Sequence, residues 1–327
     1  MLMRTLFLFL AALFAANMAV AQSWKPAPAP LMTRWGKEIS PEKTPWPEYP
    51  RPQLVREQWQ NLNGLWSYAV VDKGADKPTK WDGEILVPYC IESALSGVGK
   101  RVSDKQELWY RREIEIPADW KGHNILLHFG AVDFEATVYV NGQEVGFHRG
   151  GNTPFSFDIT KSLKEGAKNE LLVKVWDPTD AGAQPRGKQI RNPHGIWYTP
   201  VTGIWQTVWM EPVSPSHLST IEVTSNIKKG TVTLRVTGAD LKPSDVVHAE
   251  LRTGPTSVQA QIKGGSVEVP ITAEPWTPDS PKLYEIDLEL KRDGKTIDTA
   301  KSYFAFREIA LGKDEQGVQR LLLSGKQ

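Results

Sequence analysis

A short loop between two stretches of strand-forming residues carries side chains that could bind a polar ligand. His148 and Arg149 stand directly before Gly150 and Gly151, and an aromatic stretch then ends at Asp158. Glycines let a backbone fold tightly, and an ionised carboxylate such as that of Asp158 accepts strong, charge-assisted hydrogen bonds. The alternative is purely local: Asp158 caps the turn that follows it, and Arg149 is a solvated loop charge. Both interpretations of this loop stay open.

A second candidate is the long polar segment from Asp177 to Tyr198, which lies between two aromatic-rich stretches. Loops of this length within a compact domain are usually functional or disordered. Asp177 and His194 could hydrogen-bond the hydroxyl groups of a sugar, and Trp197 could stack on a sugar ring. The competing interpretation places Trp197 in the core, together with Trp205, and places His194 in a turn.

Other classes of site find little support. Lys+Arg 39 against Asp+Glu 38 leaves a formal net charge of +1, so no basic excess favours nucleic acid. The six histidines are scattered and Cys90 is the only cysteine, so we expect no metal, no cofactor and no intrachain disulfide. Cys90 follows an apolar run and is expected to be a small buried residue. The 13 tryptophans are an unusual number, and core packing is the default expectation for Trp66, Trp109, Trp205 and Trp209.

The elements that must position these loops are short β-strands. Apolar runs rich in β-forming residues recur along the chain, and Ile114 and Ile116 alternate with glutamates as in a half-buried strand. Asn141–Gly142 supplies the positive backbone angles of a type I′ hairpin turn, and Asp293–Gly294 is a second signal of this kind. Helical periodicity is weak, and the proline-free stretch Leu54–Leu62 is the best candidate for one short helix. We therefore predict an all-β fold.

Changes in composition divide the chain. Residues 1–21 combine an early arginine, an apolar run and a small-residue cleavage site, which predicts a secretory signal peptide, with an uncleaved membrane anchor as the alternative. Residues 22–56 are rich in proline and tryptophan and are expected to form an extended arm along the next domain. Residues 57–213, with their longer loops, suit a jelly-roll sandwich. Residues 214–310 alternate more cleanly and suit an immunoglobulin-like β-sandwich.

Six motifs follow one another after the signal segment. They are LNGLW at 62–66, WYRREIEIP at 109–117, FGAVDFEATVYVNGQEVGFHRGGNTPFSFDIT at 129–160, GIWYTPVTGIWQTVWMEPV at 195–213, WTPDSPKLY at 276–284 and YFAFREI at 303–309. In this order and spacing they resemble the amino-terminal half of glycoside hydrolase family 2, the family of β-galactosidases, β-glucuronidases and β-mannosidases. The whole string is a strong signal, although no single motif would be.

The resemblance implies a sugar-binding jelly roll, an immunoglobulin-like domain and then a catalytic (β/α)8 barrel, with residues 311–327 as the lead-in to that barrel. Because the family's two catalytic glutamates lie in the barrel, it assigns no catalytic residue to this chain. It implies instead that jelly-roll loops complete the substrate pocket, where Asp158 would bind sugar hydroxyls and Arg149 would contact an acidic or hydroxylated sugar. The β-galactosidase type carries an acidic residue near Gly150, and this chain lacks it.

The resulting expectation is the amino-terminal fragment of a secreted, retaining β-glycosidase. It would be periplasmic or extracellular, would help to bind a β-linked carbohydrate, and would be inactive without a barrel in the same polypeptide. One alternative is a free-standing carbohydrate-binding module, since jelly rolls also support lectins. Another is a structural or interaction protein of the periplasm built on two β domains. After the signal segment, no stretch is long and apolar enough to predict a membrane span.

Overall fold

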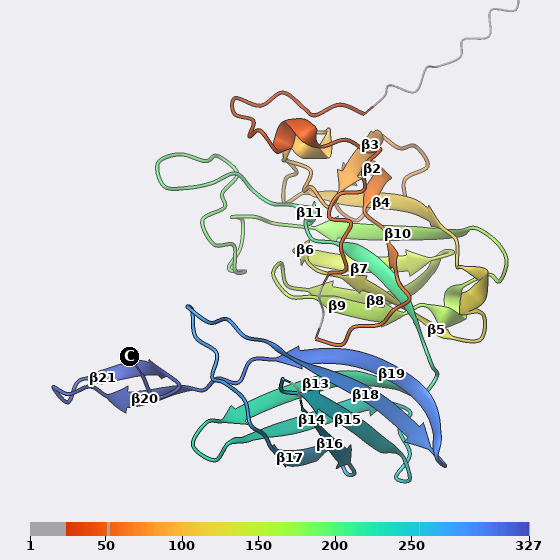
Figure 1. Cartoon of the computed structure of the whole chain (residues 1–327). Coiled ribbons are helices and arrows are strands. Elements are labelled where there is room, and N and C mark those ends of the chain that lie inside the picture. Colours follow the sequence, from red (N-terminus) through yellow and green to blue (C-terminus); the bar gives the residue numbers. More distant parts are fainter. Residues whose placement is uncertain (1–23, 51–52, 255, 327) are drawn as a thin grey trace, which may run out of the picture.

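The computed structural model describes residues 24–50, 53–254 and 256–326 (Figure 1). Within these ranges the regular elements are β-strands and four single 3-10 turns, η1 (Gly36–Glu38), η2 (Ala94–Ser96), η3 (Ala118–Trp120) and η4 (Thr160–Ser162). The predicted all-β fold is confirmed. The predicted signal peptide, residues 1–21, lies outside the described residues. No helix in the described part of the chain is long and apolar enough to cross a membrane.

The first domain is a sandwich of two antiparallel sheets. The larger sheet has the order β3 (Gly83–Val87), β2 (Gly64–Asp72), β4 (Gln106–Ile114), β10 (Asn169–Trp176), β7 (Glu135–Val140) and β8 (Gln143–Arg149). The facing sheet has the order β1 (Gln60–Asn61), β12 (Val208–Val213), β5 (Asn124–Phe129) and β9 (Phe155–Asp158). A further pair, β6 (Val132–Asp133) and β11 (Gly203–Ile204), lies at one end of the sandwich. The predicted turn joins β7 to β8, with φ of 51° at Asn141 and 82° at Gly142.

The core of this domain explains part of the tryptophan content. Trp66 is fully buried between the sheets and meets Tyr110 edge to face. Trp109 and Trp209 are buried as well, although they lie outside this apolar cluster. The core position expected for Trp205 is wrong: its ring is only half-buried, and its indole Nε1 donates to the backbone oxygen of Gly151 at 2.7 Å. Trp205 follows β11 directly, at the rim of the sandwich, where a loop covers it in place of a second sheet.

The second domain is a separate sandwich with its own core. Strands β13 (His217–Asn226), β14 (Thr231–Ala239) and β17 (Ser266–Pro270) face β16 (Ser257–Ile262), β15 (Val246–Arg252), β18 (Tyr284–Arg292) and β19 (Lys295–Phe304). Alternate residues such as Ile286, Leu288 and Leu290 point into the core, as their spacing predicts. Asp293 and Gly294 form the turn between β18 and β19 with positive φ. The structure thus agrees with an immunoglobulin-like sandwich.

The helix predicted for Leu54–Leu62 is wrong. This segment is extended: Val55 pairs with Lys301 of β19, and β1 pairs with β12. The reason is that its two terminal leucines enter different cores, Leu54 that of the second domain and Leu62 that of the first. A helix would place them on one short cylinder, whereas an extended chain reaches both domains.

The proline-rich arm follows the surface of the first domain before it reaches this segment. The indole of Trp24 donates to the backbone oxygen of Ser96 at 3.0 Å, and the side-chain amide of Asn63 donates to the backbone oxygen of Pro45 at 3.0 Å. Trp35 remains exposed. Hydrogen bonds, one of them from the indole of Trp24, therefore hold the described part of the arm in place, whereas Trp35 does not contribute to burial.

A hairpin follows the second domain and projects away from it. Strands β20 (Ile309–Lys313) and β21 (Gln319–Leu323) pair only with each other among the described strands (Figure 1). The side chains of Ile309, Leu311 and Leu321 are 65% to 72% exposed. An apolar hairpin that stands free of its own domain is an unusual feature of a soluble surface.

Candidate functional site

Three segments that are distant in the sequence meet at the β6–β11 end of the first sandwich. The long segment between β10 and β11 leaves the sandwich there (Figure 1). With β6 and the loop after β8 it lines a cavity of about 460 Å³ that is open to solvent, which we name the loop cavity. Its lining consists of Asp133, Asn152, Arg186, Gly187, Lys188, Gln189, Tyr198, Val201 and Trp205.

Asp133 is the acidic residue of the loop cavity. Burial, reinforced by the negative charges of Asp177 and Glu92, raises its pKa to about 7. The loop after β8 lies directly against this carboxyl group: a Cβ at Gly151 would come within 2.5 Å of the Asp133 Cγ. Because only glycine fits there, the loop that carries Gly150 and Gly151 is shaped around Asp133.

Two further carboxyl groups, close enough to act on the charge of Asp133, hold the long segment in place. Asp177 accepts hydrogen bonds from the Thr179 backbone N–H at 2.7 Å and from the Thr202 hydroxyl at 2.9 Å. Glu92 accepts from the Thr202 backbone N–H at 2.9 Å. Burial raises the pKa of Glu92 to about 7 and also raises that of Asp177. Asp177 therefore holds the two ends of the segment together, since Thr179 lies at its start and Thr202 at its end.

The long segment is ordered by its own hydrogen bonds and ion pairs. Arg191 forms an ion pair with Asp104 and another, at 2.8 Å, with Asp180. The backbone N–H of Tyr198 donates to the oxygen of Lys188 at 2.9 Å. These contacts give the described loop a defined shape, and they leave Arg186 and Lys188 facing the cavity.

Comparison with known proteins agrees with this architecture. The sequence model described as "Glycosyl hydrolases family 2, sugar binding domain" matches residues 87–209, and the one described as "Glycosyl hydrolases family 2" matches residues 206–307. The chain belongs to glycosyl hydrolase family 2. It is similar to a β-galactosidase of Thermoanaerobacter pseudethanolicus, 28% identical over 63% of this chain and 29% of that protein. It is also similar to the β-glucuronidase of Sus scrofa, 25% identical over 85% of this chain and 48% of that protein.

The fold of this family 2 chain also matches solved structures. A β-glucuronidase from Ruminococcus gnavus has a TM-score of 0.65 at 20% identity, over 84% of this chain and 49% of that one. A β-glucuronidase from Lactobacillus rhamnosus has the same TM-score at 24% identity. In each of these comparisons the chain spans less than half the length of the protein that it matches.

The site residues predicted from the sequence differ in their position relative to the loop cavity. Asp177 does not line the loop cavity but holds the ends of the long segment together, and Trp197 is half-buried, with its ring centroid 6.0 Å from Cζ of the cavity residue Arg186. Neither Trp197 nor Trp205 belongs to the apolar core, so the alternative that placed them there is wrong. His194 is exposed, its Nδ1 lies 2.8 Å from the backbone oxygen of Asn192, and it does not line the cavity.

Asp158 and Arg149 lie outside the loop cavity and already have protein partners. Asp158 accepts from the Thr160 backbone N–H at 2.9 Å, and Arg149 forms an ion pair with Glu135 at 2.7 Å. On β9, Phe155 pairs with Phe129 at the end of β5, and Asp158 pairs with Leu126, three residues earlier in β5. Asp158 therefore lies about 10 Å further along β9 from the cavity end of the sandwich than Phe155 does. The geometry matches the local, turn-capping role. The sugar contacts expected of Asp158 and Arg149 stay predictions.

The sequence analysis missed several residues of the loop cavity, Asp133 above all. One signal was available: Asp133 is the acidic residue of Ala131-Val132-Asp133-Phe134, where its apolar neighbours are all buried. A carboxyl group within a buried strand is costly and usually has a function or a partner. Asn152, Gln189 and Tyr198 carried no such signal, because they lie in loops whose folding depends on distant contacts.

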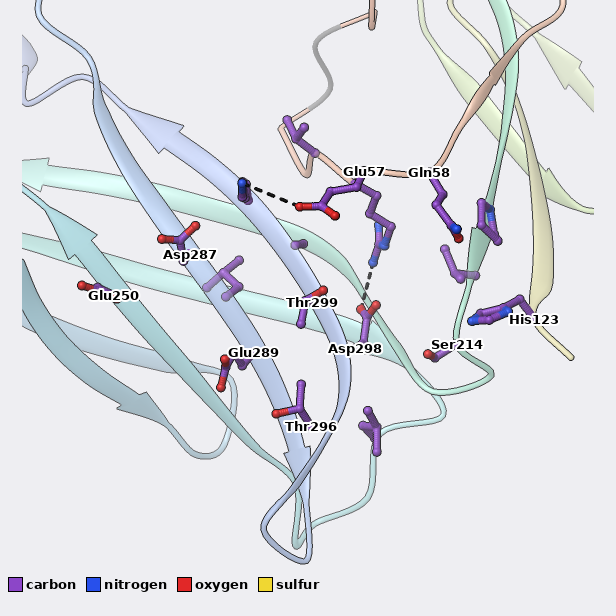
Figure 2. A pocket seen from close by; sticks show the side chains of 18 of the residues that line it. Glu57, Gln58, His123, Ser214, Glu250, Asp287, Glu289, Thr296, Asp298 and Thr299 are labelled. Atoms are coloured by element: carbon purple, nitrogen blue, oxygen red, sulfur yellow. Dashed lines mark hydrogen bonds and ion pairs between the residues drawn. The ribbon is translucent and has the colours of Figure 1, made fainter. Parts of the chain in front are cut away.

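A larger groove of about 690 Å³ lies between the two domains (Figure 2). It is lined by residues Val55–Gln58, where the arm ends and the first domain begins, by the end of β12 and by residues of β15, β18 and β19. We name it the interdomain groove. Several of its acidic residues have basic partners: Asp287 pairs with Arg252, and Glu57 lies 3.9 Å from Lys301. No cluster of three His, Cys, Asp or Glu side chains in the described part of the chain could hold a metal ion. Asp298, on β19, pairs with Arg56 across this groove, so the groove contains a contact between the second domain and the segment that precedes β1.

Proposed function

We propose that this chain supplies the sugar-binding and second β domains of a longer, retaining β-glycosidase, and that the loop cavity forms one wall of its substrate pocket. The observation that carries the proposal is the convergence of three distant segments on one cavity in a chain of this family. The cavity offers a carboxyl group at Asp133, amides at Asn152 and Gln189, and the aromatic rings of Tyr198 and Trp205. Such groups hydrogen-bond hydroxyls and pack against the apolar faces of sugar rings.

We assign none of the acids around the loop cavity to a catalytic pair. A retaining glycosidase places two carboxyl groups about 5–5.5 Å apart on opposite sides of the bond that it cleaves. Here Asp177 and Glu92 do not line the cavity and accept hydrogen bonds from Thr202, while Asp133 lines it. The two catalytic carboxylates are therefore proposed to lie in a (β/α)8 barrel of the same polypeptide. The greater length of the relatives supports this assignment.

The exposed hairpin supports the same arrangement. Ile309, Leu311 and Leu321 expose apolar surface on an element that leaves the second domain. Apolar surface of this kind is expected where further polypeptide packs. We assign its cover to the proposed barrel, because the chain matches only 29% of the length of one relative.

The proposed substrates are β-linked glycosides, in a periplasmic or extracellular setting. The first point is supported by the names of the relatives, which are β-glucuronidases and β-galactosidases. The second is supported by the composition of residues 1–21, with its apolar run and small-residue cleavage site.

The proposal is tested with the chain and two variants. The chain alone should not hydrolyse nitrophenyl β-glycosides, but it should bind methyl β-glycosides weakly in ligand-detected NMR. Asp133→Ala should abolish this binding, whereas Asp158→Asn, at the end of β9 away from the cavity, should leave it unchanged. Loss of binding in the Asp158 variant alone would place the sugar elsewhere and refute the loop cavity as a pocket wall.

Two further results test the proposed barrel. The reading frame beyond the codon for Gln327 should continue into a barrel with two catalytic glutamates, and unrelated sequence there would contradict the proposal. Hydrolysis that persists after repurification of the chain would overturn the assignment of catalysis to the barrel. Micromolar binding by the chain alone would favour a free-standing carbohydrate-binding module.

A further inference from the structure

The first described residues of the arm contact a single turn of the first domain. The indole Nε1 of Trp24 donates to the backbone oxygen of Ser96 in η2 at 3.0 Å. The backbone N–H of Ala27 donates to the oxygen of Ala94, also in η2, at 2.8 Å. We name residues 24–27 the strap, and residues 91–99, which include η2, the support turn.

The support turn is shaped to receive the strap. Gly97 and Gly99 have φ of 85° and 65°, a left-handed conformation that favours glycine. Space is a separate constraint, because a Cβ at Gly97 would overlap the indole of Trp24. A Cβ at Gly99 would lie 2.9 Å from the Cβ of Ala27. Asparagine also adopts the left-handed conformation, but at Gly97 its side chain would displace Trp24.

The support turn also holds the end of the long segment. The backbone N–H of Ile91 donates to the oxygen of Thr202 at 3.4 Å, and Glu92 accepts from the Thr202 N–H at 2.9 Å. The Thr202 hydroxyl donates to Asp177 at 2.9 Å. Val201, directly before Thr202, lines the loop cavity. One short turn thus contacts both the strap and the segment that lines the cavity.

Ser96 connects these two sets of contacts within the turn. Its backbone oxygen accepts from Trp24, and the whole residue is buried. Its Oγ lies 2.7 Å from the backbone oxygen of Ser93 and 3.3 Å from that of Ile91. Ile91 is buried as well, and in a close-packed interior neither residue moves without the other. A displacement of the strap therefore reaches Thr202 through Ser96 and Ile91.

We propose that the strap orders the long segment, so that docking of the strap on the support turn and binding of a ligand in the loop cavity stabilise each other. The binding half of this inference rests on the proposed function, whereas the ordering half does not. Trp24 is a positioning residue, because it acts on the cavity only through the support turn. Coupling between two sites is reciprocal, so a bound ligand must also tighten the strap.

Two variants displace the strap in different ways. Trp24→Ala removes the indole, and Gly97→Asn keeps the backbone conformation but fills the space that the indole occupies. In both, amide hydrogen exchange of residues 177–202 without ligand should be about threefold to tenfold faster than in the native chain. Binding of methyl β-glycosides, measured by ligand-detected NMR, should weaken by a similar factor. In the native chain, a saturating glycoside should slow exchange in peptides that contain Ala27.

Matched controls separate loss of docking from general effects of substitution. Trp35→Ala removes an arm tryptophan that is 63% exposed. Gly74→Asn introduces asparagine at φ of 82°, where an added Cβ would meet no atom within 4 Å beyond its chain neighbours. Both variants should keep the native exchange rates and the native affinity. Exchange in the strands of the second domain is the internal reference and should stay native in all four variants.

The outcomes separate this inference from the proposed function. If residues 177–202 exchange at the native rate in both Trp24→Ala and Gly97→Asn, the inference is refuted. Equally faster exchange throughout the first domain would show only a general loss of stability and would refute it too. If the segment exchanges faster while the affinity stays native, the coupling to binding is wrong and the proposed function stands. If no glycoside binds to the native chain, the proposed function is refuted, and the exchange rates still decide whether the strap orders the segment.

Discussion

Replacing Asp298 with alanine should weaken the junction between the two domains. Asp298 lies on β19 at the interdomain groove (Figure 2) and accepts hydrogen bonds from Nη2 of Arg56 at 2.9 Å and from the Leu218 backbone N–H at 2.8 Å. Arg56 belongs to the arm, and its Nη1 lies 3.7 Å from Glu211 of β12. One buried guanidinium thus links the arm, the first domain and the second domain.

The expected cost follows from what the substitution leaves behind. Removing one partner of a buried ion pair typically costs about 3–5 kcal/mol. Here Glu211 and the backbone oxygen of Leu218, 2.9 Å from Arg56, still compensate the guanidinium, so we expect about 2–3 kcal/mol for Asp298→Ala. Asp298→Asn keeps an oxygen for the Leu218 N–H and should cost about 1–2 kcal/mol. The control is Glu57→Gln, because Glu57 and Lys301 are 89% and 65% exposed and their pair should contribute at most about 0.5 kcal/mol.

Urea unfolding followed by two probes measures this cost. Of the 13 tryptophans, only Trp276 lies in residues 214–327, so tryptophan fluorescence reports mainly on the first domain. Far-UV circular dichroism reports on both domains. In Asp298→Ala the two transitions should shift and move apart, because the domains lose their shared ion pair. Coincident transitions with a free energy of unfolding within about 0.5 kcal/mol of the native value would refute the junction as we describe it.

Three other predictions concern the site and the hairpin. Burial raises the pKa of Asp133 from 3.8 and that of Glu92 from 4.5 to about 7, so the folded chain binds more protons than the unfolded chain between these values. The free energy of unfolding should therefore fall as pH rises through this window. In urea unfolding at pH 5 and at pH 8, the difference between the two free energies should be about 1–3 kcal/mol smaller in Asp133→Asn than in the native chain. An unchanged difference would contradict the raised pKa of Asp133. Gly151→Ala would press a methyl group against the Asp133 carboxyl, so it should lower the free energy of unfolding by about 1–3 kcal/mol and weaken the binding of methyl β-glycosides. A variant that keeps the native affinity would disprove the close fit between Gly151 and Asp133. The isolated chain should self-associate on a sizing column, and Leu311→Lys/Leu321→Lys should make it monomeric; a native chain that elutes as a monomer at all concentrations would show that the hairpin needs no cover.

The fold could be predicted from local patterns because its determinants are local. Alternating apolar residues such as Ile286, Leu288 and Leu290 identify strands whose inner face is buried, and Asn141–Gly142 identifies a hairpin. The mistaken helix at Leu54–Leu62 had a different cause. Its apolar residues serve two cores at once, and no periodicity within one segment reveals that it connects two domains.

The site was harder to predict, because the roles of its side chains depend on partners far away in the sequence. Both candidate loops lie at the loop cavity, but their conspicuous polar residues do not all line it. The carboxylate of Asp177 is occupied by Thr179 and Thr202, 25 residues away along the chain. Arg191, three residues after Lys188, forms the ion pairs with Asp104 and Asp180, whereas Arg186 and Lys188 line the cavity. The sequence alone does not distinguish these three cations.

The two candidate loops are parts of one structure, and this explains the paired glycines that follow Arg149. The indole of Trp205, at the end of the long segment, donates to the backbone oxygen of Gly151, and the same glycine lies against the carboxyl of Asp133. A side chain at Gly151 would push the loop away from both groups. The glycine is thus required because it lets the backbone connect the acidic floor of the cavity to its aromatic wall. Because each loop holds the other in place, a ligand that contacts either loop meets a surface that is already ordered before binding. Such preorganisation reduces the entropy lost on binding.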